Sequence, residues 1–160
     1  MRGGETYLMI LKSAHRKFFK GFTLIELLIV IAILGILAAA VLVAINPGKR
    51  TRQAQDAKRK NDVGALATEV QGYYTSPGQG TYPASLDVLT VQQYLKQMPY
   101  DPTGAGGLVK YSYVTAGGGL TEVSVYATLG EPTSTGGTYV WCWQSTSGVA
   151  RELTNTACSP

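Results

Sequence analysis

The sequence predicts an α+β fold in which a long N-terminal helix packs against a small antiparallel β-sheet. Three observations support this fold class. An apolar run from Phe22 to Ile45 holds 24 residues with a single charge. A stripe of apolar residues at helical spacing follows it, and beyond residue 108 apolar residues recur at every second position. One helical region followed by strands, in a chain of 160 residues, indicates a modest head domain joined to a membrane segment.

Residues 1–21 form a basic N-terminal segment, which we expect to be a leader that lies in the cytosol. They hold five basic residues and one acid, and the basic residues gather just before the apolar run. A secretory signal would instead place its apolar region before a cleavage site of small residues. The translation start is open between Met1 and Met9.

The apolar run, residues 22–45, is long enough to span a membrane as one helix. At 1.5 Å per residue it reaches about 36 Å, against about 30 Å for a hydrocarbon core. Charge does not set the orientation, because residues 49–60 beyond the run are as basic as the leader. Cys142 and Cys158 favour an exported C-terminus, where one disulfide would form in an oxidising compartment. The alternative is two unpaired thiols.

A break and a second helix are expected after the apolar run. Pro47 and Gly48 are expected to kink the chain or to melt a short stretch of it. The spacing then predicts an amphipathic helix over about 49–74, within a segment 46–75 that continues the first helix. Its apolar stripe consists of Val63, Leu66, Val70 and Tyr73.

Residues 76–160 are expected to form a globular head that begins with turns and ends in strands. Short helical turns are expected within residues 81–89 and 91–102. Beyond them, period-two patterns predict strands over 108–114, 121–129, 138–145 and 149–154. This order predicts an antiparallel sheet that covers the apolar stripe of the second helix.

Glycines and aromatic residues complete the prediction for the head. Gly117, Gly118 and Gly119 indicate a hairpin between the first two strands. Tyr139, Trp141 and Trp143 alternate on one strand and so share one face of the sheet. We expect them to pack over the helix stripe; the alternative is an adhesive aromatic patch.

The string KGFTLIE, residues 20–26, followed by the apolar run, resembles the class III signal of type IV pilins and type II secretion pseudopilins. The resemblance is strong over residues 16–45 and consistent in layout over the whole chain. It implies the pilin fold. It also implies that a prepilin peptidase cuts between Gly21 and Phe22 on the cytosolic face, and that the new amine of Phe22 is methylated. The basic leader would be held at the anionic inner surface of the membrane.

Glu26 is the one acid in the apolar run. Lipid makes such an acid costly, by about 2.5 to 3.5 kcal/mol at the bilayer centre and less near an interface. In a filament core an unpaired carboxylate would be worse still, unless a cation meets it. The resemblance implies that the amine of Phe22 on a neighbouring subunit is this cation, which makes Glu26 a registry residue for assembly. The alternative is an interfacial acid that reaches the head-group region.

Two features indicate different branches of the family. The order of motifs within residues 81–113 resembles major pseudopilins of type II secretion, although some short bacterial pilins share it. Cys142 and Cys158 instead enclose a C-terminal segment, as the disulfide-bounded region of type IV pilins does. Major pseudopilins usually lack that disulfide and often hold calcium in the same area. We expect no cofactor, with calcium as the alternative, because the acids available there form no ligand-spaced cluster. These acids are Asp101, Glu122, Glu131 and Glu152.

Other functional classes find little support in the residues. The single histidine, His15, lies in the leader, so the mature chain lacks a histidine-based catalytic site and we expect no enzyme. The basic residues 49–60 have no interleaved aromatic residue to stack on bases. We therefore interpret them as a solvated helix face that pairs with acids of adjacent heads, with DNA binding as an alternative. A single-pass protein that is never cut is a more distant alternative.

The sequence-based hypothesis is a prepilin that becomes a structural subunit of a type IV pilus-like filament for adhesion, motility or DNA uptake. The alternative is a major pseudopilin of a type II secretion system. The expected partners are further copies of the chain, prepilin peptidase, an inner-membrane assembly platform with its ATPase, and membrane lipid before assembly; nucleic acid stays open. We expect one span of the inner membrane with a cytosolic N-terminus, and later a place in an extracellular pilus or a periplasmic pseudopilus.

Overall fold

The computed structural model describes residues 21–76, 78–104, 109–116 and 120–160. The leader up to residue 20, with both candidate start sites, and the expected hairpin glycines 117–119 lie outside the described residues. The chain divides into two compact units, one up to Ala44 and one from Ile45 to Pro160.

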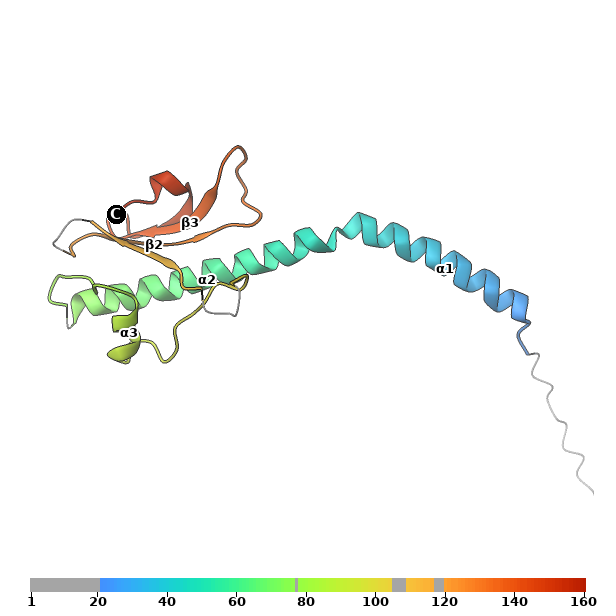
Figure 1. Ribbon diagram of the computed structural model, residues 1–160, viewed down its shortest axis with the longest axis horizontal. Helices are drawn as coiled ribbons and strands as arrows, with labels where there is room; N and C mark the ends of the chain where they lie inside the picture. The colour runs from blue at the N-terminus through green and yellow to red at the C-terminus, as the bar shows by residue number, and fades with distance from the viewer. Residues whose placement is uncertain (1–20, 77, 105–108, 117–119) are drawn as a thin grey trace, which may run out of the picture. The chain divides into compact units, whose positions relative to one another are not determined.

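Most of the described part of the first unit belongs to the helix α1, Leu24–Ile45, drawn in blue in Figure 1. None of its side chains is buried, although leucine, isoleucine, valine and alanine dominate it. It is long and apolar enough to cross a membrane, as the sequence predicted. No described residue of the unit covers this apolar surface, which is therefore available to lipid or to other helices.

The helix α2, Pro47–Thr75, begins after a single non-helical residue, Asn46. Asn46 has φ 48° and ψ 74°, in the left-handed region that asparagine tolerates better than most residues. Its side chain accepts a hydrogen bond from the N–H of Lys49 at 3.2 Å, so it caps α2. Pro47 and Gly48, the expected site of the break, form the first turn of α2, where proline's missing N–H costs nothing.

The head contains a four-stranded antiparallel sheet in the order β1-β2-β3-β4. Its strands are β1, Ser112–Thr115; β2, Val123–Thr128; β3, Tyr139–Gln144; and β4, Ala150–Thr154. The four predicted strands are therefore confirmed, although the first begins later than expected. Lys110, within the predicted strand, instead makes an isolated bridge with Tyr100.

The predicted helical turn within residues 91–102 is wrong. The single helix of this region is α3, Asp87–Val91, which is followed by turns. Gln93 adopts a positive φ of 64°, which ends the helix, and prolines at 99 and 102 prevent a new one. The backbone of Tyr100 pairs with that of Lys110 instead.

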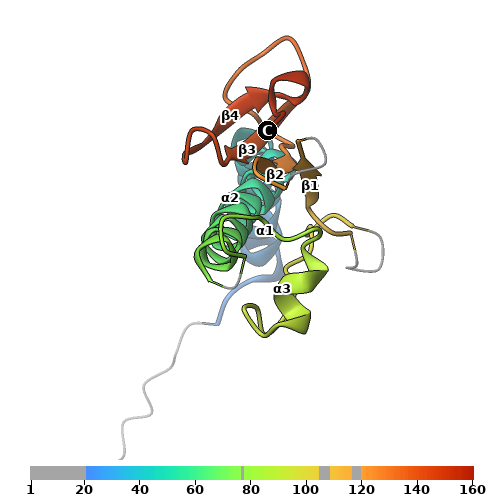
Figure 2. The same ribbon diagram turned by 90° about the vertical axis from the view of Figure 1, so that its left-hand side faces the viewer.

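The core of the head lies between α2 and the sheet, as Figures 1 and 2 show. Val63, Leu66 and Val70, three residues of the predicted stripe, are fully buried. Alternate residues of β2 meet them because a strand presents every second side chain to one face. The buried residues of this core from the sheet are Val123, Val125, Ala127 and Trp143.

The three aromatic residues of β3 have different environments. Trp143 is buried in the core beside the helix stripe, as expected. Trp141 is half-buried at the edge of that core, and the Nζ of Lys60 lies 4.7 Å from its ring centroid. Tyr139 lies outside the core, and its hydroxyl donates to the carbonyl of Thr135 at 3.0 Å. The expectation that all three pack over the stripe is therefore wrong for Tyr139.

The C-terminal segment covers the other face of the sheet. A 3-10 helix, Asn155–Ala157, precedes a disulfide between Cys142 on β3 and Cys158, which confirms the predicted pairing. Two buried polar side chains of the sheet reach the same segment: Ser124 donates to the carbonyl of Cys158 at 3.5 Å, and Gln144 donates to that of Ala157 at 3.3 Å. The disulfide therefore fixes a small second core on the outer face of the sheet.

Candidate processing and assembly site

The first candidate site is the chain just before α1. Gly21, Phe22 and Thr23 precede the helix, and the side chain of Phe22 is 90% exposed. A Cβ atom added to Gly21 would meet no atom within 4 Å among the described residues. The described residues therefore do not require glycine at this position, which is consistent with a requirement set by another molecule.

Glu26 and Thr23 form a capping box at the start of α1. The N–H of Glu26 donates to Oγ1 of Thr23 at 3.2 Å, and the N–H of Thr23 donates to Oε2 of Glu26 at 2.8 Å. The hydroxyl of Thr23 donates to the same Oε2 at 2.8 Å. This arrangement satisfies N–H groups that a helix start leaves unpaired. Sequence reasoning missed Thr23, although threonine three residues before glutamate is a readable signal of a helix start.

The two carboxylate oxygens of Glu26 differ in their environment. Both hydrogen bonds from Thr23 go to Oε2, and Oε1 accepts none from the residues that the structure describes. The acid therefore has a partner within its own chain and still presents one oxygen to another molecule. A cation near the start of α1 would find an acceptor there.

Comparisons with known proteins identify the family of the chain. Residues 16–42 match the prokaryotic N-terminal methylation motif. Type II secretion system core protein G of Pseudomonas aeruginosa is 33% identical over 122 residues, which cover 64% of this chain and 78% of that protein. The chain belongs to the family of type IV pilins and type II secretion pseudopilins. This family is structural rather than enzymatic. No solved structure matches the chain significantly.

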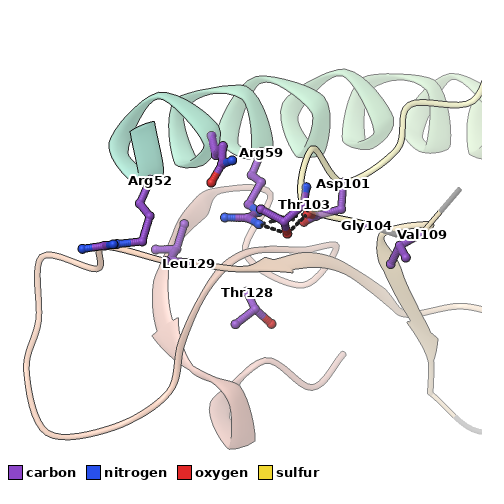
Figure 3. Close-up of a pocket in the computed structure, with 10 residues that line it drawn as sticks. Arg52, Arg59, Asp101, Thr103, Gly104, Val109, Thr128 and Leu129 are labelled. Carbon is purple, nitrogen blue, oxygen red and sulfur yellow. Dashed lines mark hydrogen bonds and ion pairs between the residues drawn. The ribbon is translucent and has the colours of Figure 1, made fainter. Parts of the chain in front are cut away.

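Within the head of this family member, two arginines of α2 have acidic partners in the same chain. Arg59 is buried; its Nη1 contacts Oδ1 of Asp56 at 2.7 Å, and its Nε and Nη2 contact the two oxygens of Asp101 at 2.7 and 2.9 Å (Figure 3). Arg52 pairs with Glu131. The expectation of a solvated face is therefore wrong for Arg59, which is buried against acids of its own head. Arg52 is exposed, as expected.

The ion pairs of Arg59 set the charge state of the cluster. The hydrogen bonds from Arg59 hold the pKa of the Asp101 carboxyl well below its usual range, against the opposing effect of burial. Thr103 adds a second donor, since its N–H and hydroxyl both bond to Oδ1 of Asp101. Removing only one partner of such a buried ion pair strongly destabilises the folded head, because the other charge is then buried without a partner.

A pocket of about 590 Å³ opens beside this cluster (Figure 3). Its charged lining residues are Arg52, Arg59 and Asp101, and all three already have partners within the chain. The remaining lining residues are Gln55, Thr103, Gly104, Val109, Thr128, Leu129 and Gly130. Among the described residues, this lining holds no free nucleophile with a base beside it and no unpaired charge.

The acids that were candidates for calcium do not fit a calcium site. Asp101 faces Arg59, Glu131 faces Arg52, and Glu152 accepts the N–H groups of residues 133 and 134. Glu122 is exposed and lies just before β2, away from the other three acids. Within the described ranges, no three residues among histidine, cysteine, aspartate and glutamate gather as metal ligands would. Calcium needs six to eight oxygen ligands, and this donor set does not supply them.

Proposed function

We propose that this chain is a structural subunit of a type IV pilus-like filament, cut between Gly21 and Phe22 and methylated on the new amine of Phe22. The match of residues 16–42 to the methylation motif supports the processing. The exposure of Phe22 supports access by a peptidase. Gly21 then serves a narrow subsite of prepilin peptidase, since the fold itself makes no demand for glycine there.

The observation that carries the proposal is the free oxygen of Glu26. After cleavage, the amine of Phe22 on a neighbouring subunit is a cation, and Oε1 of Glu26 is an acceptor without a partner in the described chain. Pairing the two removes an unpaired charge of each sign from the apolar interior of the fibre. A subunit that enters out of register leaves both charges unpaired, so the pair selects the correct register.

The proposed route places α1 first in the inner membrane and then in the filament core. None of its side chains is buried within the chain, so the same apolar surface can face lipid or other helices. The N-terminus lies in the cytosol, and the disulfide forms outside, in an oxidising compartment. Membership of the pilin and pseudopilin family supports an inner-membrane platform and its ATPase as the machinery that drives the transfer.

The choice of a pilus over a secretion pseudopilus is supported by the disulfide. Cys142 and Cys158 close a C-terminal segment over the outer face of the sheet, like the disulfide-bounded region that the sequence resembles. The second candidate, a major pseudopilin, is favoured by the relative in Pseudomonas aeruginosa, which is named as a type II secretion core protein.

Deletion of the gene in its own organism separates the two candidates. We expect electron microscopy to show that long surface fibres are lost, while the set of proteins in the culture medium is unchanged. Intact fibres together with exoproteins that accumulate inside the cell would contradict the pilus and support the pseudopilus. Re-expression of the unchanged chain serves as the control.

A further inference from the structure

We propose that the loop between β2 and β3, residues 129–138, is held by two carboxylates that accept its backbone N–H groups, so that the head needs no calcium there. The inference goes beyond the proposed function, since it concerns the folding of a single subunit and holds for either kind of filament. It rests on contacts at three places along the loop.

The start of the loop is fixed to α2 by Asp56, whose side chain is buried. The N–H of Gly130 donates to Oδ1 of Asp56 at 2.9 Å, and the N–H of Glu131 donates to Oδ2 at 2.7 Å. Arg59 adds a third donor to Oδ1 at 2.7 Å. Hydrogen bonds to an ionised acceptor are stronger than those between neutral groups, so this carboxylate holds two successive loop residues firmly.

The middle of the loop is fixed to β4 by Glu152. The N–H of Thr133 donates to its Oε2 at 3.1 Å, and the N–H of Ser134 donates to its Oε1 at 2.8 Å. Burial alone would raise the pKa of Glu152, but these donors outweigh it and the pKa is lowered. Glu152 is therefore ionised at neutral pH, and both of its oxygens face donors of the protein.

The acid within the loop also has a partner in the chain. Glu131, the acid within the loop, pairs with Arg52 through Nη2 at 2.5 Å and Nε at 2.7 Å. At the base of the loop the N–H of Leu129 donates to the carbonyl of Tyr139 at 3.0 Å. Arg52 and the buried Arg59 are the ion-pair partners of the acids beside the loop, so these carboxylates face cations of their own chain. The carboxylates thus hold the loop in place, as a bound metal ion would otherwise do.

Thermal unfolding of the full chain, purified in detergent, tests the proposal directly. The melting temperature is measured in millimolar calcium chloride and in excess EGTA. A calcium site filled at a hundred times its Kd would raise the melting temperature by roughly 10 °C. We expect the two values to agree within the error of the measurement. A rise in calcium would overturn the proposal.

The variant Glu152→Gln tests the role of the carboxylate. Glutamine keeps one oxygen but loses the charge and one of the two acceptors, so amide exchange at Thr133 and Ser134 should be about tenfold faster, in calcium and in EGTA alike. Glu122→Gln, an exposed acid next to β2, is the matched control and should leave these rates unchanged.

Two outcomes of the exchange experiment would overturn the proposal. One is unchanged exchange at both amides in Glu152→Gln, which would mean that the carboxylate does not hold the loop. The other is slower exchange of residues 130–137 in calcium than in EGTA for the unchanged chain. The comparison on the unchanged chain decides between calcium and the carboxylates even where a variant folds poorly.

Discussion

At the scale of single residues, the two carboxylate oxygens of Glu26 differ in their hydrogen bonds. Oε2 is engaged by Thr23 of the same chain, which starts the helix, and Oε1 accepts nothing from the described residues. A capping box would by itself explain an acid at this position without any role in assembly. The two explanations make different predictions for Thr23, whose side chain serves the cap alone.

Thr23→Val keeps the shape of the side chain but removes the hydroxyl that caps α1. Loss of such a cap costs about 1 kcal/mol, so amide exchange at Glu26 should become faster. Fibres per cell should stay near the wild-type number, because the free oxygen of Glu26 is untouched. Thr51→Val, which removes a hydroxyl bonded to the carbonyl of Pro47 in α2, is the matched control. Fibre loss in Thr23→Val, with intact processing, would contradict a separate role for Oε1.

Asp101 makes the stability of the head depend on pH. Its pKa in the folded head lies below the unfolded value of about 3.9, so the stabilising effect is present above that pH and is lost as the pH falls through the folded pKa. Chemical denaturation from about pH 5 down to about pH 2 should therefore show a falling free energy of unfolding.

The variant Asp101→Asn should reduce this dependence, since asparagine does not titrate. Asp87→Asn is the matched control, because Asp87 forms an exposed pair with Lys110 and contributes little. Equal slopes against pH for Asp101→Asn and the unchanged chain would contradict the assignment of the effect to the pair with Arg59.

At the scale of elements, the disulfide decides whether the C-terminal segment stays on the sheet. The double variant Cys142→Ser, Cys158→Ser opens a loop of 15 intervening residues, which should cost about 3 kcal/mol of unfolding free energy. Denaturant titration of the variant and of the unchanged chain, with and without reductant, measures this. Reductant should lower the stability of the unchanged chain and leave the variant unaffected. Equal stability of the two chains without reductant would contradict the role of the disulfide.

Patterns that repeat along the chain predicted the elements well. Val63, Leu66 and Val70 of the stripe and the alternate apolar residues of β2 are buried in one core, because side chains that face the same core recur at the period of the helix or strand. Residues 91–102 carry no such repeat. Their backbone follows a pairing between Tyr100 and Lys110, which is a contact between segments, and local sequence carries little information on such contacts.

The ion pairs of α2 show the same limit. Six basic residues within 49–60 predicted a solvated surface, yet Arg59 is buried. Its partner Asp101 lies 42 residues further along the chain, so only the folded head brings the two together. The capping box of Thr23 and Glu26 is different, since the residues are three apart and the signal could have been read from the sequence.

At the scale of the whole molecule, the two units differ in whether they bury their own apolar side chains. The head carries its own core, its own ion pairs and its disulfide, whereas α1 buries nothing within the chain. Sequence and comparisons establish the family, while the pairing of Glu26 with a neighbouring subunit is the claim on which the proposed function depends. A single chain cannot display that pair, because one half of it belongs to another copy.

The most direct test is the number of fibres per cell made by Glu26→Gln, counted by electron microscopy beside the unchanged chain. Intact mass of the membrane-extracted protein shows whether each chain starts at a methylated Phe22. The account predicts that Glu26→Gln is processed and present in the membrane at the normal level, yet forms few or no fibres, because glutamine offers the amine no charge. Fibres of Glu26→Gln as abundant as those of the unchanged chain would contradict it.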